Sequence, residues 1–301
     1  MGWRSILIAC PARIQVKNRQ IRVETEKGEA TFPLEDAESL VLDSPQVFLS
    51  SALLSELAEN GIALHVCGRT HLPNGVLVPY SGHFRQAGIA DRQLGISEPQ
   101  RRRLWREIVR RKIENQAECL NLLGKNGGDR IRKMSAIVKS GDPDNLEGTA
   151  AGFYFSSLFG EDFSRRREDK TNALLNYGYA IVRGALARSV AAQGLLPMFG
   201  IFHRSERNPF NLVDDLIEPY RPVVDLIVCS EEWEDDEDLR PSEKKRLVEI
   251  LHRDVRINGE RRTVSASIEF FLDSLVAYFE HGDPSRVLLP EIVMSSPREM
   301  E

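Results

Sequence analysis

The amino-acid sequence predicts an α+β protein, with a small β domain in residues 1–80 and a larger helical domain in residues 81–301. Apolar and polar residues alternate through most of the β domain, which is typical of strands with one buried face. After Tyr80-Ser81-Gly82 the apolar residues recur with a period near 3.6, which is typical of amphipathic helices. The 301 residues, 42% hydrophobic and 28% charged, have an ordinary globular composition.

The β domain is predicted from six short segments. ARIQVKN, QIRVETEK and EATFPLED alternate regularly, and the connections NRQ and KGE suit tight hairpins. SLVLDS, IALHVCG and GVLVPY predict further strands. Between them we expect one short helix, ALLSELAEN, with its N-cap at Ser50-Ser51 and its C-cap at Gly61.

The helical domain begins with a long segment from Ser97 to Gly124. This segment has a serine cap, a proline in its first turn and an apolar stripe. In the helix after Asp169, Tyr177 and Tyr179 are expected in the core or at its edge. Gly or Pro residues end the further expected helices, at 131–140, 144–158, 170–192, 211–218, 242–253 and 263–280.

Charge is unevenly distributed around the net value of −5. Seven acids between Glu231 and Arg240 predict a solvated surface loop. Residues 101–140 instead contain twelve Lys or Arg against four acids, a local field that can steer a polyanion. Six arginines of this segment lie on more than one helix face, so some are expected only to be solvated: Arg101, Arg102, Arg103, Arg106, Arg110 and Arg111.

The four cysteines are scattered, without paired short spacings, at Cys10, Cys67, Cys119 and Cys229. This indicates reduced thiols in a cytoplasmic protein and argues against a zinc site. No segment approaches the roughly 20 apolar residues of a membrane span. The apolar run at the start is too short for a signal peptide.

Three acids fall on one face of the helix expected at 211–218. Asp214 and Asp215 precede Glu218 by four and three residues, so the three charges repel unless a cation lies among them. Capping and salt bridging are the ordinary roles for Asp214 and Asp215. Glu218 lies near the helix end, where the dipole disfavours an anion, and it precedes a proline. It therefore needs a partner.

Two more residues could join Glu218. His203 follows an apolar run, where a histidine is ordinarily structural, but Arg204 and Arg207 beside it suit a phosphate. Glu147 lies in the first turn of a helix that Asp144 or Asn145 would cap, and by itself it would be a capping acid. Two carboxylates and one imidazole together suit Mg²⁺ or Mn²⁺. Spacing alone leaves open whether the three residues meet.

Three linked motifs in the second half of the chain resemble a known family. EGTAAGFYFSSLFG, DKTNALLNYGYAIVRGALARSVAAQGLLPMFGIFH and NPFNLVDDLIEPYRPVVD occur in this order over residues 147–225. They resemble the integrase subunit of CRISPR adaptation, the CRISPR-associated (Cas) protein one family. NLVDDLIEPYRP is most similar to the versions found beside single-effector, type II systems. The strand-rich start followed by helices fits this family over essentially the whole chain.

The resemblance implies an N-terminal β-sandwich for dimerisation and partner contacts, followed by an all-α catalytic domain. It implies that Glu147, His203 and Glu218 are the catalytic residues and ligands of Mg²⁺ or Mn²⁺. Many relatives carry aspartate where this chain has Glu218, whose longer side chain should preserve ligation. Many also carry a second histidine where this chain has Phe202.

The implied activity is that of a metal-dependent DNA endonuclease and integrase. The 3′-OH of a short duplex, the prespacer, would attack a phosphodiester at the CRISPR repeat, without a covalent enzyme intermediate. The implied partners are both DNAs, a second copy of the chain and a small ferredoxin-like subunit, with an effector nuclease complex as a further candidate and no membrane. We expect phosphate contacts from basic residues close to the site or before the 170–192 helix: Arg165, Arg166, Arg204 and Arg207.

Two alternatives keep parts of this prediction. A structure-selective nuclease for branched DNA would use the same site without joining strands, and dependence on a free 3′-OH separates it from an integrase. A non-enzymatic DNA-binding scaffold would use the acids only in salt bridges, with Arg204, Arg207 and Arg221 as their partners.

Overall fold

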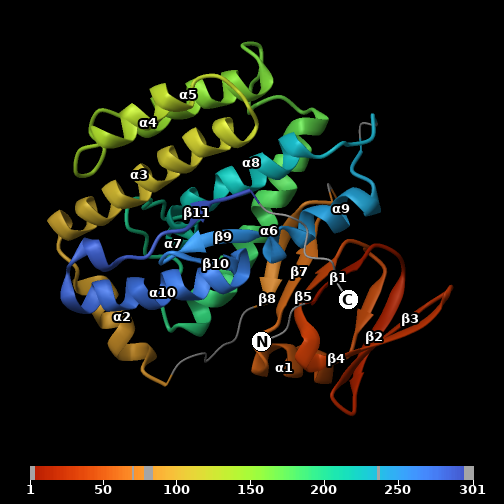
Figure 1. The fold of residues 1–301 in the computed structure, drawn as a ribbon. Coiled ribbons are helices and arrows are strands. Elements are labelled where there is room, and N and C mark those ends of the chain that lie inside the picture. Colours follow the sequence, from red (N-terminus) through yellow and green to blue (C-terminus); the bar gives the residue numbers. More distant parts are fainter. Residues whose placement is uncertain (1–3, 70, 78–83, 236–237, 295–301) are drawn as a thin grey trace.

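The computed structural model describes residues 4–69, 71–77, 84–235 and 238–294 (Figure 1). The predicted boundary at Tyr80-Ser81-Gly82 and the acids Asp236 and Glu237 lie outside these residues. The N-terminal strands are β1 (Arg4–Ile8), β2 (Ala12–Lys17), β3 (Gln20–Thr25), β4 (Gly28–Pro33), β5 (Ala37–Leu42), β6 (Val47–Leu49), β7 (Ala63–Cys67) and β8 (Pro73–Leu77). The helix α1 (Ser51–Glu59) is capped by Ser50, as predicted.

Two four-stranded sheets are formed by the N-terminal strands. One has the order β1-β5-β7-β8, with its first three strands parallel, and the other has the order β4-β3-β2-β6. A hydrophobic core that includes Ile14, Ile21, Leu40, Leu53 and Leu57 joins both sheets and α1. β1 was not predicted, because an apolar run as short as RSILI carries little alternation.

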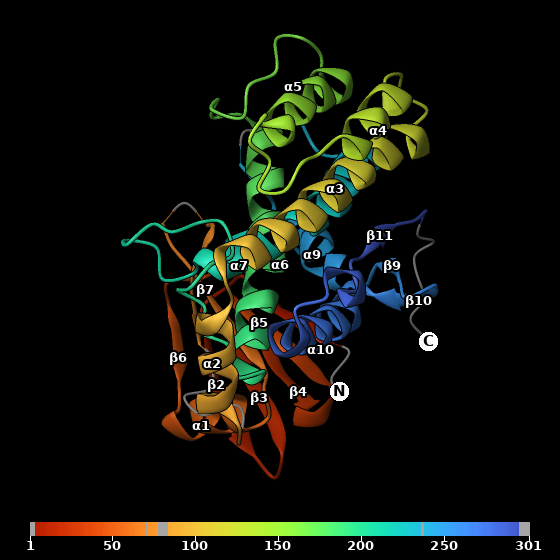
Figure 2. The same ribbon diagram turned by 90° about the vertical axis from the view of Figure 1, so that its left-hand side faces the viewer.

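The rest of the chain is mainly helical. Its helices are α2 (Gln86–Gly95), α3 (Glu98–Leu122), α4 (Gly128–Ala136), α5 (Leu146–Phe159), α6 (Lys170–Ala192), α7 (Asn211–Leu216), α8 (Arg221–Ser230), α9 (Pro241–Val248) and α10 (Val264–His281). The long α3 starts at a capping box of Ser97 and Gln100, with Pro99 in its first turn. The pair α4 and α5 lies along α3, at the end away from the N-terminal sheets (Figures 1 and 2).

The all-α description of this second region is wrong. A three-stranded sheet of order β10-β9-β11 lies beside α10, formed by β9 (Asp254–Ile257), β10 (Glu260–Thr263) and β11 (Glu291–Ile292). Asn258 and Gly259 make the β9–β10 turn with φ of 52° and 80°. The helix predicted at 242–253 is present as α9 and a 3₁₀ turn, Glu249–His252, that follows it directly. The helices α2 and α8 were not predicted, and α7 ends at Leu216 rather than at residue 218.

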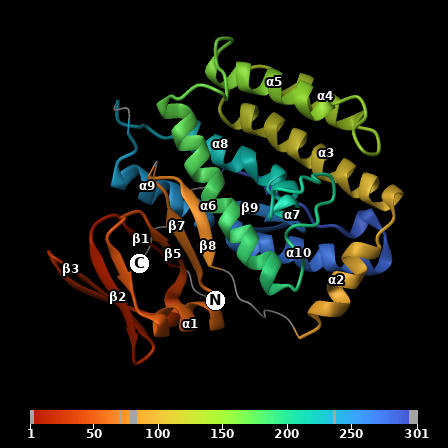
Figure 3. The ribbon, with the colours of Figure 1, turned by 180° about the vertical axis from the view of Figure 1, so that it is seen from behind.

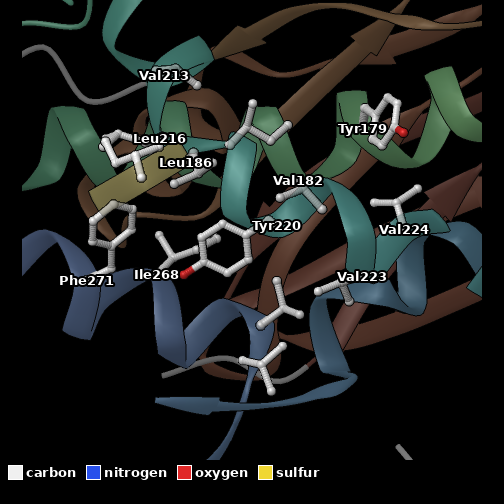
Figure 4. Packing of buried hydrophobic residues seen from close by; sticks show 14 of the residues in the cluster. Tyr179, Val182, Leu186, Val213, Leu216, Tyr220, Val223, Val224, Ile268 and Phe271 are labelled. Carbon is white, nitrogen blue, oxygen red and sulfur yellow. The ribbon is translucent and has the colours of Figure 1, made fainter. Parts of the chain in front are cut away.

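The helix α6 lies at the centre of the molecule, between the sheet strands β7 and β8 and the helices α8 and α10 (Figure 3). Tyr177 and Tyr179 on this helix are buried, as predicted. Figure 4 shows Val182 and Leu186 of α6 packed with Tyr220 and with Ile268 of α10. This core fixes the turn that carries Glu218, because Tyr220 is fully buried two residues later.

The junction between the sheets and the helices is close-packed and charged. Gly184 on α6 faces the buried His65 of β7, and a Cβ atom at position 184 would overlap the imidazole ring. Nearby, Lys244 Nζ of α9 lies 2.7 Å from Asp43 Oδ2, and both side chains are buried. This close approach and this buried ion pair are two of the contacts that join the two regions.

Smaller predictions have mixed outcomes. All four cysteines are free thiols, as predicted. In the acidic loop, Glu232, Glu234 and Asp235 are exposed as expected, whereas Glu231 pairs with Arg253 at 2.5 Å. Over the ranges that the structure describes, no helix has both the length and the apolar character needed to cross a membrane.

The contact of Gly184 with His65 predicts a strong effect of one added methyl group. Gly184→Ala should lower the free energy of unfolding by about 1–3 kcal/mol, because the new Cβ forces α6 away from β7. Gly152→Ala in α5 is the matched control, since a Cβ there has nothing within 4 Å. It should stabilise the protein by up to about 1 kcal/mol. Urea unfolding of both variants measures the difference, and equal effects would contradict the packing described.

Candidate metal and DNA-binding site

Two of the predicted acids meet at a lysine. Glu147 lies in the first turn of α5, Glu218 begins the short turn between α7 and α8, and Lys112 lies in the middle of α3. Lys112 Nζ is 2.5 Å from Glu147 Oε1 and also forms an ion pair with Glu218 Oε2. Figure 3 shows α3, α5 and α8 side by side at this point. One ammonium group therefore joins three segments that are far apart in the sequence.

Asn145, one of the two predicted residues, is at the N-cap of α5, but its side chain makes no capping hydrogen bond. Asn145 is in the left-handed region with φ of 50°, and Asp144 pairs with Lys139 instead of capping. The capping hydrogen bonds are made by Asp142, whose carboxylate accepts the backbone N–H groups of Leu146 and Glu147 at 2.9 and 3.0 Å. Because this places the carboxylate of Asp142 on the first turn, the Glu147 side chain is not needed for capping and extends to Lys112.

Glu218 has the partners that its position at a helix end requires. Its Oε1 accepts a hydrogen bond of 2.8 Å from Arg221 Nε, in addition to the Lys112 contact. Burial alone would raise the pKa of Glu218, but the charges of Lys112 and Arg221 outweigh it and lower that pKa to about 2. In the described part of the chain, the buried Oε2 accepts no hydrogen bond of regular geometry, although Lys112 lies against it. The Lys112 ammonium is therefore the cation at this oxygen.

His203 is held by an acid that sequence reasoning treated as ordinary. Its Nδ1 lies 2.6 Å from Oδ1 of the buried Asp215. Asp215 also accepts the backbone N–H groups of Ile201, Phe202 and His203, at 2.6, 2.9 and 3.2 Å. The hydrogen bond between the His203 imidazole and Asp215 raises the pKa of His203, and burial of the ring opposes this only in part. Since Nδ1 is engaged, Nε2 is the ring nitrogen available to a ligand.

Asp214 and Asp215, for which the same roles were expected, have different partners in the structure. Asp214 makes the predicted salt bridge, with its Oδ1 2.6 Å from Arg183 Nε. Asp215 also pairs with a basic partner, His203, but its carboxylate in addition binds the backbone N–H groups of the 201–203 loop, a role that the prediction did not include. Lys112 was missed as well. It lies four residues after Ile108 on the apolar stripe of α3, and a lysine on a buried face signals a buried acid that needs a counter-charge.

His203 and Glu218 line one hollow of about 370 Å³ together with Arg165, Arg183 and Arg221. Among the residues with described coordinates, no group of three or more His, Cys, Asp or Glu is placed as a metal cluster. The ammonium of Lys112 lies between Glu147 and Glu218 instead. The donor set still fits a hard cation in place of that ammonium, because it offers two carboxylates and an oriented imidazole.

The predicted DNA-contacting arginines differ in their surroundings. Arg165 lines the hollow, where it donates hydrogen bonds to Asn172 and, at 2.6 Å, to Asn176. Arg204 is exposed and pairs with Glu98 at 2.5 Å. Arg166 and Arg207 are exposed. Sequence reasoning missed Arg183, and it placed Arg221 only in a salt bridge, although both line the hollow.

A buried network supports the arginine beside Glu218. Asp225 of α8 is fully buried and accepts hydrogen bonds from Tyr154, at 2.9 Å, and from Tyr179. Burial raises the pKa of Asp225 to about 6, despite these hydrogen bonds. The guanidinium of Arg221 lies 4.7 Å from the centre of the Tyr179 ring. The network therefore fixes the residue that orients Glu218.

Glu218, an oriented His203 and several arginines line one hollow, and Glu147 meets Glu218 through Lys112; enzymes use such groups on phosphodiesters. Residues 6–234 match the family described as CRISPR associated protein Cas1. The chain therefore belongs to the Cas1 family. It is 39% identical, over 97% of both chains, to the CRISPR-associated endonuclease Cas1 of Neisseria meningitidis serogroup C (strain 8013).

Solved structures show the same fold. A casposase bound to integration product matches with a TM-score of 0.78 and 18% identity, over 93% of this chain and 92% of the casposase chain. A Cas6-RT-Cas1–Cas2 complex matches with a TM-score of 0.72 and 18% identity, over 97% of this chain and 36% of that one. At these identities the likeness concerns the fold.

The position of Lys112 between two acids predicts a large loss of stability when its charge is removed. Lys112→Met leaves Glu218 buried beside Glu147, so the free energy of unfolding in metal-free buffer should fall by about 3–5 kcal/mol. Lys139→Met is the matched control, because its pair with Asp144 is exposed and should contribute at most about 1 kcal/mol. Similar losses in both variants would show that the Lys112 contacts are not formed.

Asp225 predicts a pH dependence of stability. Its ordinary pKa of 3.8 applies to the unfolded chain, and its folded pKa is about 6. Between these values the unfolded chain loses the proton first, so the free energy of unfolding falls with rising pH, by about 3 kcal/mol in total. Asp225→Asn should remove this slope. Urea unfolding from pH 4 to 7 measures it, and parallel curves for the two proteins would contradict the assignment.

Proposed function

We propose that this Cas1-family protein is a divalent-metal-dependent DNA endonuclease and integrase of CRISPR adaptation. It would join the 3′-OH ends of short DNA duplexes to phosphodiesters at the CRISPR repeat. One observation carries the proposal: Glu147 and Glu218 both contact the ammonium group of Lys112. Glu218 also lines a hollow together with His203 and three arginines. The name of the Neisseria meningitidis relative supports the endonuclease activity, and the casposase bound to integration product supports strand joining.

Three residues of this chain would hold the metal ion, Mg²⁺ or Mn²⁺. Glu147 and Glu218 would bind through their carboxylates and His203 through Nε2, after the Lys112 ammonium has moved away from the two acids. When bound, such an ion lowers the pKa of an attacking hydroxyl and offsets the charge that develops on the phosphate. Asp215 keeps the imidazole oriented, as the outer carboxylate of a histidine ligand does.

The arginines around the hollow would position the DNA. Arg165, Arg183 and Arg221 present guanidinium groups close to Glu218 and His203, which suits the oxygens of a phosphodiester. In the joining step, the 3′-oxygen of the duplex forms a new bond to phosphorus while the bond to the 3′-oxygen of the target strand breaks. The attacking hydroxyl loses its proton and the departing oxygen gains one, so the number of phosphodiester bonds is conserved.

We infer a second copy of the chain and a small ferredoxin-like subunit as protein partners, with the N-terminal β-sandwich as the contact region. The solved Cas6-RT-Cas1–Cas2 complex supports a partner of this kind. The motif NLVDDLIEPYRP supports a type II form, in which an effector nuclease would join the complex. The nuclease without joining and the non-enzymatic scaffold remain the competing functions.

A strand-transfer assay tests the proposal. The protein, with its partner subunit, is incubated with a 3′-OH duplex, a supercoiled plasmid that carries the repeat, and Mn²⁺. His203→Ala should reduce joining about 100-fold or more, because it removes the imidazole that would bind the metal ion. His281→Ala, at the exposed end of α10, should join normally.

The failures of this assay are informative. Joining must also disappear with a 3′-dideoxy duplex, since that duplex lacks the attacking hydroxyl. Nicking that ignores the 3′ end would favour the structure-selective nuclease. A protein that binds DNA but gives no metal-dependent product would favour the scaffold.

A further inference from the structure

A buried amide on α3 contacts the segment that carries Glu218. Asn115 is 2% exposed, and its side chain makes three hydrogen bonds, all to backbone groups. Its Nδ2 donates to the carbonyl of Pro219 at 2.8 Å and to the carbonyl of Pro290 at 2.9 Å. Its Oδ1 accepts the N–H group of Ile292 at 3.2 Å. Because a carbonyl can only accept, these partners determine which way the amide points.

The backbone around Glu218 has fewer hydrogen-bond donors than an ordinary helical segment. Pro219 directly follows Glu218, and Pro222 lies three residues further on, and neither has a backbone N–H group. Pro219 is buried, where an unpaired carbonyl would cost free energy, and its carbonyl is paired with Asn115. The amide therefore fixes the backbone directly after Glu218.

Lys112 and Asn115 contact neighbouring residues of the turn. They lie three residues apart on one face of α3, where Lys112 contacts the Glu218 carboxylate and Asn115 the Pro219 carbonyl. A metal ion bound by Glu218 would displace the ammonium of Lys112. The Asn115 amide is neutral and bonds to the backbone, so its hydrogen bond can remain. Asn115 therefore keeps Glu218 attached to α3 after the lysine has moved.

The strand β11 fixes the orientation of this amide. Two of the three hydrogen bonds of Asn115 go to Ile292 in β11 and to Pro290, the residue before the strand. β11 pairs with β9, with Ile292 opposite Val255. Both of these side chains are buried in the main core, so the strand has a fixed position. β11 therefore holds the amide with its Nδ2 toward Pro219.

We propose that Asn115 is a positioning residue of the metal site, which holds Glu218 in place through the carbonyl of Pro219 when a divalent ion displaces the Lys112 ammonium. This inference rests on the proposed function, since it requires that Glu218 binds the ion. Both N–H groups of the amide are used by backbone carbonyls, so Asn115 acts through Glu218 rather than on the ion or the DNA. The support of the site thus extends to β11.

The test measures Mn²⁺ affinity by electron paramagnetic resonance of the free ion. Asn115→Ala should raise the Kd for Mn²⁺ about 10- to 100-fold, the usual cost of removing a group that supports a metal ligand. Asn115→Ser is the milder variant, because its hydroxyl can donate one hydrogen bond in place of two. It should also raise the Kd, and it serves as the test where Asn115→Ala fails to fold.

The control for lost stability is Leu57→Ala, which removes a fully buried side chain from the core of the N-terminal sheets and should leave the Kd unchanged. A wild-type Kd in folded Asn115→Ala or Asn115→Ser would overturn the proposal. Equal rises of the Kd in Asn115→Ala and Leu57→Ala would also overturn it, because they would follow from lost stability alone. Failure of the proposed function appears separately, as absent metal-dependent joining by the wild type while the difference in Mn²⁺ Kd persists.

Discussion

The proposed site depends on the paired contacts of the Lys112 ammonium group with Glu147 and Glu218. Glu147 and Glu218 come from different helical segments, and two carboxylates placed this close would repel in a buried setting. The lysine charge allows both to be ionised inside the fold. α3, α5 and the α7–α8 turn each supply one of the three charged groups. The packing of these segments against one another therefore determines whether the charges at the site are balanced.

The surrounding structure can be understood as support for this charge balance. Tyr220 lies in the core that α6 and α10 form, which fixes the turn of Glu218 (Figure 4). Asp225 and Tyr179 fix Arg221, the second cation at Glu218. On the other side, Asp215 binds the loop of His203 through three backbone N–H groups. The proposed ligands are therefore held by buried partners while the hollow stays open to a substrate.

Sequence patterns predicted the order of strands and helices because alternation and helical periodicity are local signals. They failed where the signal was short or ambiguous. The segment DVRINGERRT contains an Asn-Gly turn, yet it follows a helical pattern directly, and the hairpin was taken as part of a helical region. The apolar α8 was missed because Pro219 and Pro222 suggested an end, whereas Pro222 is accommodated in its first turn.

The proposed ligands could be predicted, but their neighbours could not. Glu218 was identified because an acid at a helix end before a proline needs a partner. The place of Lys112 on the apolar stripe of α3 indicates a buried acid, but it does not show which one, because Glu147 is 35 residues away in the sequence. Asp215 resembles Asp214 in sequence, and only the fold of the 201–203 loop separates their roles. Contacts over such distances depend on tertiary packing.

The most direct test of this account is a Mn²⁺ titration followed by electron paramagnetic resonance of the free ion. The wild type should bind one ion per chain, and Glu147→Gln should abolish this binding. Lys112→Met should bind the ion more tightly, because the competing ammonium is gone. Binding that survives Glu147→Gln, or that is equal in the wild type and Lys112→Met, would contradict a single cation position shared by Glu147 and Glu218.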